Sequence, residues 1–259
     1  MTILESIILG LLQGFTEFLP VSSSGHLALT ENLMGHKDVP LIYDILLHVA
    51  SLMAVMIFFR RKIADLFNGM TNFKEYNAQH KYLVLLIIST VITGGMVFIT
   101  KPLLLIMRDR PVFLSGAFLF TAIMLFTAQF FLKKRFEKKE ITWIDAVFIG
   151  FFQGIAVLPG VSRSGSTITA ALLRKINSED AVEYSFMLAI PAILGALVLE
   201  SAKGSFSAID PVLALSGFTA SFLASMIALK FLVFMIRRTV LYPFALYLVL
   251  LSLSVIFIY

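Results

Sequence analysis

Long apolar runs constrain this chain more than any other feature of its sequence. Several of them approach or exceed the roughly 20 residues that a helix needs to cross the hydrocarbon core of a bilayer. They lie at about 41–59, 82–100, 112–132, 182–200, 211–235 and 241–258. Because lipid offers no partner to open backbone groups, such runs cross a membrane as helices. Only 14% of the 259 residues are charged, against about 25% in soluble domains, so we predict an all-α polytopic membrane protein.

Two further apolar segments contain polar residues that are costly inside a membrane. The first reads QGFTEFLPVSSSGH from Gln13 to His26, and the second reads QGIAVLPGVSRSGST from Gln153 to Thr167, 140 positions later. Identical pairs at this offset include Gly10/Gly150, Gln13/Gln153, Gly14/Gly154, Val21/Val161, Ser22/Ser162, Ser24/Ser164 and Gly25/Gly165. An internal repeat of this kind indicates two related halves.

Each motif separates two apolar stretches that are short for a span. Residues 3–19 stop at Pro20 and residues 22–34 follow, while in the copy 143–158 is followed by 162–174. One interpretation is a single span, a surface turn and an amphipathic piece. The other is a re-entrant hairpin of two half-helices, which is allowed where protein or water covers the turn. Because the design occurs twice, the hairpin is favoured.

Each half of the chain then consists of one hairpin and three spans. A hairpin leaves the membrane on the side from which it entered, so three crossings place the second copy in the opposite orientation. We predict an inverted-topology repeat within a single membrane domain, 1–259, with repeat 1 at about 1–135 and repeat 2 at about 141–259. Such repeats place binding sites at the midplane, between broken helices.

The basic residues predict how the protein is oriented. Most of the 21 lysines and arginines fall in the loops at 60–81, 133–140, 174–181 and 236–240. The positive-inside rule places these loops in the cytoplasm, so both termini lie outside. We assign the net charge of +5 to this topology and expect no nucleic-acid partner. Cysteine is absent, which excludes disulfides, thiol catalysis and thiolate metal sites.

The inner half-helices begin near the predicted midplane. A helix N-terminus offers free N–H groups and the positive end of its dipole, so it binds anions. Serine hydroxyls can add hydrogen bonds, and glycine lets the backbone approach a ligand closely. The residues that we expect to bind an anion in this way are Ser22, Ser24, Gly25, Ser162, Ser164 and Gly165.

Arg163 and Glu17 are the charged candidates for this site. A guanidinium matches phosphate oxygens, and an arginine near the bilayer centre is normally functional. The alternative is that Arg163 forms only a buried ion pair with Glu17. A carboxylate at position 17 can hold Mg²⁺ or Ca²⁺ beside a phosphate, or act as a base. Asp44 and His48, one helical turn apart, either line the same pocket or brace the hairpin.

Ser23 and His26 complete the candidate catalytic set. Ser23 occupies the position of the first motif that Arg163 occupies in the second, which suggests that Ser23 attacks while Arg163 clamps. A nucleophilic serine needs a nearby base, and within the motif this is Glu17 or His26. A histidine can transfer protons near neutral pH, but it can also simply hydrogen-bond a carbonyl group.

These motifs resemble those of the undecaprenyl-diphosphatase family, bacterial integral-membrane enzymes associated with bacitracin resistance. The resemblance covers essentially the whole chain and includes EFLPVSSSGH, LPGVSRSGSTIT and the FMLAIPA run at 186–192. The family's (E/Q)xxxE element falls on Gln13 and Glu17, and its serine and histidine fall on Ser23 and His26. Its PGxSRSxxT element falls on Pro159, Gly160, Ser162, Arg163, Ser164 and Thr167. By this resemblance, Gln13 and Thr167 join the predicted substrate-binding residues.

The resemblance implies hydrolysis of undecaprenyl diphosphate to undecaprenyl phosphate and inorganic phosphate in a bacterial inner membrane. The product carries peptidoglycan precursors. The implied substrate is a long-chain polyprenyl diphosphate, and the implied cofactor is a divalent cation, Mg²⁺ or Ca²⁺, with Glu17 either binding this ion or acting as a base. The orientation predicted from the basic loops opens the site to the outer face. Gln13 stands where many family members have a second glutamate, which leaves the metal one carboxylate here. The sequence leaves a homodimer open.

Two other classes of membrane protein share part of this pattern. A transporter or lipid-carrier flippase also uses inverted repeats with broken helices, and phosphate release by the purified protein separates it from a phosphatase. A second class of lipid phosphatase pairs SGH and SR elements with a downstream histidine and aspartate. Ser24-Gly25-His26 and Ser162-Arg163 match this pattern, but no histidine follows Arg163, so that catalytic set is incomplete.

Overall fold

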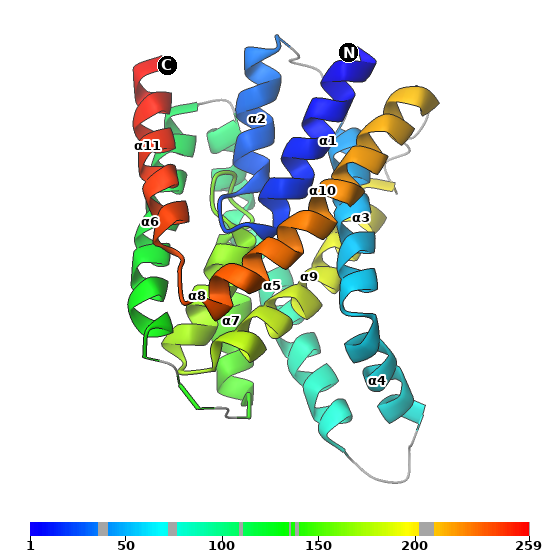
Figure 1. Ribbon diagram of the computed structural model, residues 1–259, viewed down its shortest axis with the longest axis vertical. Coiled ribbons are helices and arrows are strands. Elements are labelled where there is room, and N and C mark those ends of the chain that lie inside the picture. Colours follow the sequence, from blue (N-terminus) through cyan, green and yellow to red (C-terminus); the bar gives the residue numbers. More distant parts are fainter. Residues whose placement is uncertain are drawn as a thin grey trace.

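The fold is known from a computed structural model that describes residues 1–35, 41–71, 77–108, 111–134, 136–137, 140–201 and 210–258. All regular elements in these ranges are α-helices (Figure 1). They are α1 Ile3–Phe18, α2 Ser23–Leu33, α3 Leu41–Phe58, α4 Arg60–Thr71, α5 Ala78–Arg108, α6 Pro111–Leu132, α7 Trp143–Ile155, α8 Arg163–Leu173, α9 Ser178–Ser201, α10 Pro211–Arg237 and α11 Tyr242–Ile258. The predicted all-α class is confirmed.

Each apolar run that we expect to cross the membrane is a helix. Within α5, α6, α9 and α10, segments long and apolar enough to span a bilayer are present. Helix α3 reaches that length only together with α4, from which it is bent by 74°, and α11 is an apolar helix of 17 residues. Large apolar side chains such as Phe98, Leu215 and Phe257 are exposed. The chain is therefore a polytopic membrane protein.

The prediction of a loop throughout 60–81 is wrong, because α4 occupies Arg60–Thr71. This helix is amphipathic. Leu66 is buried and packs against the main core, whereas Arg60 and Arg61 are exposed. The sequence prediction missed this helix because basic residues lie between its apolar ones. They lower the mean hydropathy of the segment below that of a span, although the apolar residues have helical spacing. Figure 1 shows α4 at the lower end of the molecule.

Both predicted hairpins are present. Helix α1 ends at Phe18, and Leu19 is extended at φ −64° and ψ 142° because a following proline disfavours helical backbone. The chain then turns back into α2. In the second hairpin the turn between α7 and α8 contains Gly160 at φ +86°. Figure 1 shows the chain entering α1 from the upper end and α7 from the lower end, with both termini at the top.

The outer half-helices begin in the same way, in agreement with the sequence repeat. Thr2 caps α1 in a capping box with Glu5, and Thr142 caps α7 in a capping box with Asp145. In each box the threonine hydroxyl accepts a backbone N–H while the acid accepts the N–H of the threonine. Thr2/Thr142 and Glu5/Asp145 are separated by the same 140 positions as the motifs.

Each outer half-helix packs on a long span from the other half of the chain. Helix α1 lies against α10, and α7 lies against α5. A Cβ atom added to Gly10 would lie 2.3 Å from the carbonyl oxygen of Gly217, and one added to Gly150 would lie 2.6 Å from that of Ser89. The repeated glycines therefore allow helices from the two halves to approach closely, as small residues do in membrane helix pairs.

The order of elements follows the predicted inverted repeat. Helices α1, α2, α3, α5 and α6 correspond in order to α7, α8, α9, α10 and α11. Two corresponding pairs pack on one another, α3 on α9 and α6 on α11. In the second pair Ser115 and Ser252 share a hydrogen bond of 2.8 Å between their hydroxyl oxygens. The residue limits of the two repeats, near 135 and 141, stay a prediction.

Candidate active site

The turns of the two hairpins meet. The hydroxyl of Ser164, in the first turn of α8, donates a hydrogen bond of 3.4 Å to the carbonyl oxygen of Leu19 in the α1–α2 turn. The glycine near the start of each inner helix packs against the turn of the other hairpin. A Cβ atom added to Gly165 would lie 3.3 Å from the Cβ of Pro20, and one added to Gly25 would lie 3.0 Å from the Cα of Gly160. Residues that are far apart in the sequence therefore share one site.

Glu17 is the centre of this site. It lies in the last turn of α1 and is 7% exposed. One carboxylate oxygen accepts a hydrogen bond from Arg163. The other accepts bonds of 2.6 Å from the Ser23 hydroxyl and 3.0 Å from the Gln13 amide. A buried carboxylate is stable only with such partners, so the sequence interpretation of an Arg163–Glu17 pair is confirmed as a contact.

Ser23 is held against Glu17 by an unusual turn. It is the first residue of α2, and the preceding Ser22 caps the helix with its hydroxyl at 3.4 Å from the N–H of Gly25. Ser22 has φ +71° and ψ 94°, a conformation that non-glycine residues rarely adopt and that costs about 1–3 kcal/mol. This strained turn aims the Ser23 hydroxyl at the carboxylate, so the geometry pairs this serine with Glu17.

His26 is buried one turn into α2 and has different partners. Its Nδ1 atom lies 2.7 Å from the carbonyl oxygen of Ser22, and its Nε2 atom lies 2.7 Å from the hydroxyl of Tyr247. The alternative of a histidine bound to a carbonyl group is therefore observed at one ring nitrogen. Ser23 donates to Glu17, so of the two bases that the sequence offered, Glu17 is the one in contact with the serine.

Arg163 comes from the other hairpin, at the first position of α8. Its Nη2 atom binds Glu17. Its Nη1 atom is buried and has no hydrogen-bond partner among the residues that the structure describes. A buried guanidinium nitrogen without an acceptor is costly, and here it lies at a helix N-terminus, where the backbone also attracts anions.

Among the other predicted binding residues, Ser162 and Ser24 lie where the inner helices begin, whereas Thr167 is packed against another helix. Ser162 repeats the capping bond of Ser22, with its hydroxyl 3.1 Å from the N–H of Gly165. Ser24 is exposed and thus accessible to a ligand. Thr167 instead lies at a packed contact, because its hydroxyl is 2.5 Å from that of Ser185 on α9 and also donates to the carbonyl oxygen of Arg163.

Three more residues complete the site. The sequence placed His48 either at the pocket or as a brace of the hairpin, and it did not indicate Ser51 or Tyr247. His48 on α3 places Nε2 3.5 Å from the Glu17 carboxylate while Nδ1 faces the carbonyl oxygen of Asp44. Its spacing from Asp44 was the available signal. Ser51, one turn further along α3, lies 3.5 Å from the Gln13 amide. Tyr247 lies in an apolar run of α11, and no local pattern connects it to His26.

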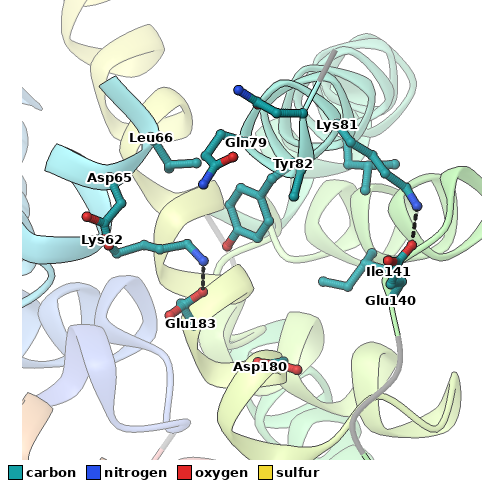
Figure 2. A pocket seen from close by; sticks show the side chains of 13 residues that line it. Lys62, Asp65, Leu66, Gln79, Lys81, Tyr82, Glu140, Ile141, Asp180 and Glu183 are labelled. Carbon is teal, nitrogen blue, oxygen red and sulfur yellow. Dashed lines mark hydrogen bonds and ion pairs between the residues drawn. The ribbon is translucent and has the colours of Figure 1, made fainter. Parts of the chain in front are cut away.

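A cavity of about 520 Å³ lies elsewhere, between α4, α5 and α9 (Figure 2). None of the predicted site residues lines it. In Figure 2, Lys62 binds Glu183 at 2.6 Å and Lys81 binds Glu140 at 2.5 Å. The hydrogen bond and charge of Lys81 hold the pKa of Glu140 below its ordinary value. Because these charges pair with one another, the hairpin site remains the candidate active site.

Two oxygens of the hairpin site suit a divalent cation. Glu17 supplies a carboxylate, and the buried Oε1 of Gln13 beside it has no hydrogen-bond partner among the described residues. No group of three or more His, Cys, Asp or Glu that could hold a metal occurs in the described ranges. Mg²⁺ is often bound by one or two protein oxygens together with water and substrate phosphates. These residues therefore fit an ion that is shared with a phosphate group.

The fold and this site define a class of polytopic membrane protein in which two opposed hairpins place an acid, a serine and an arginine together. Residues 6–254 match the family described as bacitracin resistance protein BacA, and the chain belongs to this family. It is 38% identical to the undecaprenyl-diphosphatase of Treponema denticola, over 98% of this chain and 96% of the relative. It is 39% identical to the undecaprenyl-diphosphatase of Alkaliphilus metalliredigens, over 95% of each.

A third relative in this family matches the chain over an equally large share of its length. Undecaprenyl-diphosphatase 2 of Halalkalibacterium halodurans is 33% identical over 99% of this chain and 96% of the relative. Because the matches cover nearly complete chains, they include both hairpins and the spans between them. The expected family resemblance is thereby confirmed.

Proposed function

We propose that this protein hydrolyses undecaprenyl diphosphate to undecaprenyl phosphate and inorganic phosphate. The observation that carries the proposal is the contact of Ser23 with Glu17, opposite the guanidinium of Arg163. It brings a hydroxyl group, a carboxylate and a guanidinium into one buried site, which supports their proposed roles as nucleophile, base and cation for phosphate. The names of the relatives point to the same reaction. By recycling the lipid carrier of peptidoglycan synthesis, this activity would confer resistance to bacitracin.

The diphosphate group would bind where the inner helices begin. Arg163 offers its unpaired Nη1 atom, and the N-termini of α2 and α8 offer backbone N–H groups and positive dipole ends. The residues that we propose to bind the substrate are Gln13, Ser22, Ser24, Gly25, Ser162, Ser164, Gly165 and Thr167. The polyprenyl tail would remain in lipid, beside the exposed apolar faces of the spans.

Glu17 and Ser23 would carry the chemical step. Glu17 accepts the hydroxyl proton of Ser23, whose oxygen attacks the terminal phosphorus. The bond from this phosphorus to the bridging oxygen breaks, and undecaprenyl phosphate leaves with the bond's electrons. Water then hydrolyses the phosphoserine, which releases inorganic phosphate and restores Ser23. His26 assists proton transfer in this scheme, and Arg163 stabilises the charge on the transferred phosphoryl group.

A divalent ion, Mg²⁺ or Ca²⁺, would be held by Glu17 and the amide oxygen of Gln13. It would supply charge neutralisation for the diphosphate oxygens. The need for it follows from the charges in the site. A diphosphate carries more negative charge than Arg163 alone can balance, and Glu17 already offsets part of the positive charge of that guanidinium.

The scheme also specifies where the reaction takes place. We propose that the protein lies in the bacterial inner membrane with both termini outside and the site open to the outer face, as the basic loops indicate. The residues that the reaction uses all belong to one chain, so a homodimer is compatible with this scheme but is not required by it.

The test is phosphate release from a C55 prenyl diphosphate by the purified protein in detergent, with and without a chelator. We expect release that stops on chelation and returns with Mg²⁺ or Ca²⁺. Detergent micelles have no second compartment, so release also separates hydrolysis from transport. If the folded protein releases no phosphate with either ion but moves the lipid across vesicle membranes, the flippase alternative is correct and the proposal is wrong.

A further inference from the structure

A tyrosine from the second half of the chain contacts the histidine of the first hairpin. The hydroxyl of Tyr247, on α11, lies 2.7 Å from Nε2 of His26. The two rings are stacked, with their centroids 5.6 Å apart and their planes inclined by 14°. Phe118, on α6, meets the His26 ring edge-on, also with a centroid distance of 5.6 Å. The imidazole is therefore fixed by side chains from two spans.

The hydrogen bonds determine which nitrogen of the neutral His26 ring carries the proton. The carbonyl oxygen of Ser22 can only accept, so Nδ1, at 2.7 Å from it, must donate. Nε2 then has a lone pair, and the Tyr247 hydroxyl donates to it. The partner of one ring nitrogen thus sets the tautomer at the other. This arrangement leaves the ring with no free nitrogen for Ser23.

The His26 ring in turn holds the turn that presents Ser23. Its Nδ1–H group binds the carbonyl oxygen of Ser22, the residue with φ +71°. Rare backbone conformations persist where surrounding contacts enforce them. A continuous chain of contacts therefore runs from Tyr247 through His26 to Ser22, whose neighbour Ser23 donates to Glu17 at 2.6 Å.

We propose that Tyr247 is a positioning residue of the active site. By donating to His26 Nε2 it keeps the imidazole in the Nδ1–H tautomer, and the imidazole holds Ser22 in the turn that aims Ser23 at Glu17. The role of this tyrosine in turnover rests on the proposed phosphatase function. The tautomer of His26 does not, because it can be observed without any reaction.

The direct test replaces Tyr247 by phenylalanine, which keeps the stacked ring and removes the hydroxyl. We expect kcat for phosphate release to fall about tenfold, the equivalent of one hydrogen bond of about 1.4 kcal/mol, while KM changes less than twofold. The matched control is Tyr242→Phe at the start of the same helix, whose side chain is exposed, and it should keep wild-type kinetics. Wild-type kcat in Tyr247→Phe would overturn the proposal.

A double mutant tests whether Tyr247 acts through His26. In a His26→Ala background, Tyr247→Phe should lower kcat no further, because the partner of the hydroxyl is already gone. A tenfold additional loss in that background would show that Tyr247 acts by another route, and the proposal would be wrong.

A spectroscopic measurement separates this proposal from the proposed function. ¹⁵N spectra of histidine-labelled protein, with the His26 signals assigned from a His26→Gln variant, should show the Nδ1–H tautomer in the wild type. In Tyr247→Phe the Nε2 resonance should shift, and in Tyr242→Phe it should not. A spectrum unchanged by Tyr247→Phe overturns the proposal. If the wild type releases no phosphate but Tyr247→Phe still shifts the Nε2 resonance, only the phosphatase function and the role of Tyr247 in turnover are overturned.

Discussion

The α1–α2 hairpin and the α7–α8 hairpin share a backbone plan but differ in the side chains at their turns. Each inner helix is capped by a serine that binds the N–H of a glycine three residues later, Ser22 with Gly25 and Ser162 with Gly165. The capping serines differ in backbone conformation, however. Ser22 has φ +71°, whereas Ser162 has φ −75°, so only the first of the two capping serines is strained.

The chemical groups differ at equivalent positions. At the offset of 140 residues, Val157 corresponds to Glu17 and Arg163 to Ser23, while Ser166 corresponds to His26. The first hairpin therefore carries the carboxylate, the hydroxyl of the proposed nucleophile and the imidazole, and the second carries the guanidinium. The repeated scaffold brings the turns before two helix N-termini together, and the residues that differ between the copies are complementary groups of one site. Neither hairpin alone has the full set.

The largest effect should follow from Ser23→Ala. Because Ser23 is the proposed nucleophile, we expect kcat for phosphate release to fall by about 10⁴-fold or more, with KM within a few-fold of wild type. The comparison variant is Ser254→Ala, whose exposed hydroxyl binds a carbonyl oxygen within α11 and whose loss should leave turnover unchanged. Full turnover in Ser23→Ala would assign the attack to water. Ser23 would then have no chemical role that distinguishes its hairpin turn from the turn that carries Arg163.

Arg163→Ala should have the next largest effect. Loss of the guanidinium removes charge stabilisation of the phosphoryl group and leaves Glu17 without its ion-pair partner. We therefore expect kcat/KM to fall about 10²- to 10³-fold. Arg163→Lys keeps the charge but loses the planar fork and should retain intermediate activity. Steady-state kinetics of both variants are the measurement. Equal activity of the wild type and Arg163→Ala would show that the second hairpin does not contribute to the site.

The glycines of the outer half-helices allow a smaller and purely structural comparison. A Cβ atom at Gly14 would lie 2.3 Å from the backbone oxygen of Ser221, whereas one at Gly154 would lie 2.3 Å from the side chain of Met96. The Met96 atom is its Cβ, which cannot move without the backbone, so Gly14→Ala and Gly154→Ala should each destabilise the protein by about 1–3 kcal/mol. The control is Gly116, where an added Cβ atom would meet nothing within 4 Å, and Gly116→Ala should not lower the melting temperature. Melting temperatures in detergent measure these effects. Unchanged melting temperatures in Gly14→Ala and Gly154→Ala would contradict the described helix packing.

The smallest effect concerns how the second hairpin is closed. Asp145, at the start of α7, binds Arg174 after the end of α8 at 2.6 Å. Asp145 is fully buried, but the arginine side chain is 37% exposed, so solvent screens the pair. We expect Asp145→Asn to destabilise the protein by about 1 kcal/mol and to leave the kcat of folded protein unchanged, as thermal melting and kinetics would show. A loss of kcat would connect this ion pair to the reaction.

The sequence was most informative where the repeat duplicated a pattern. A single break at Pro20 is ambiguous between a surface turn and a hairpin, but the second break at the same offset favours the hairpin, and both are observed. The pairing of Glu17 with Arg163 could be predicted for a physical reason. Two isolated opposite charges in an apolar environment stabilise each other, and inverted repeats bring their turns together.

Residues whose role depends on tertiary contacts could not be found in this way. Tyr247 lies in an apolar stretch of α11, and only the packing of α11 beside α2 brings its hydroxyl to His26. For His48 the sequence left open whether it lines the pocket or braces the hairpin, and only the contact of its Nε2 atom with Glu17 decides for the pocket. Thr167 matches the family motif, but its hydroxyl contacts Ser185, so its part in substrate binding stays a prediction.

The central claim is that the two hairpin turns meet to form one site, and a cross-link tests it most directly. The chain contains no cysteine, so Pro20→Cys and Gly165→Cys would introduce the two thiols alone. The Cβ positions of residues 20 and 165 are 3.3 Å apart, close to the range of about 3.5–4.5 Å in disulfides. Mild oxidation should therefore join them within one chain, seen as a loss of two free thiols, while Pro20→Cys with Ser254→Cys should stay reduced. If the folded Pro20→Cys/Gly165→Cys protein forms no intramolecular disulfide, the turns do not meet and the shared site is wrong.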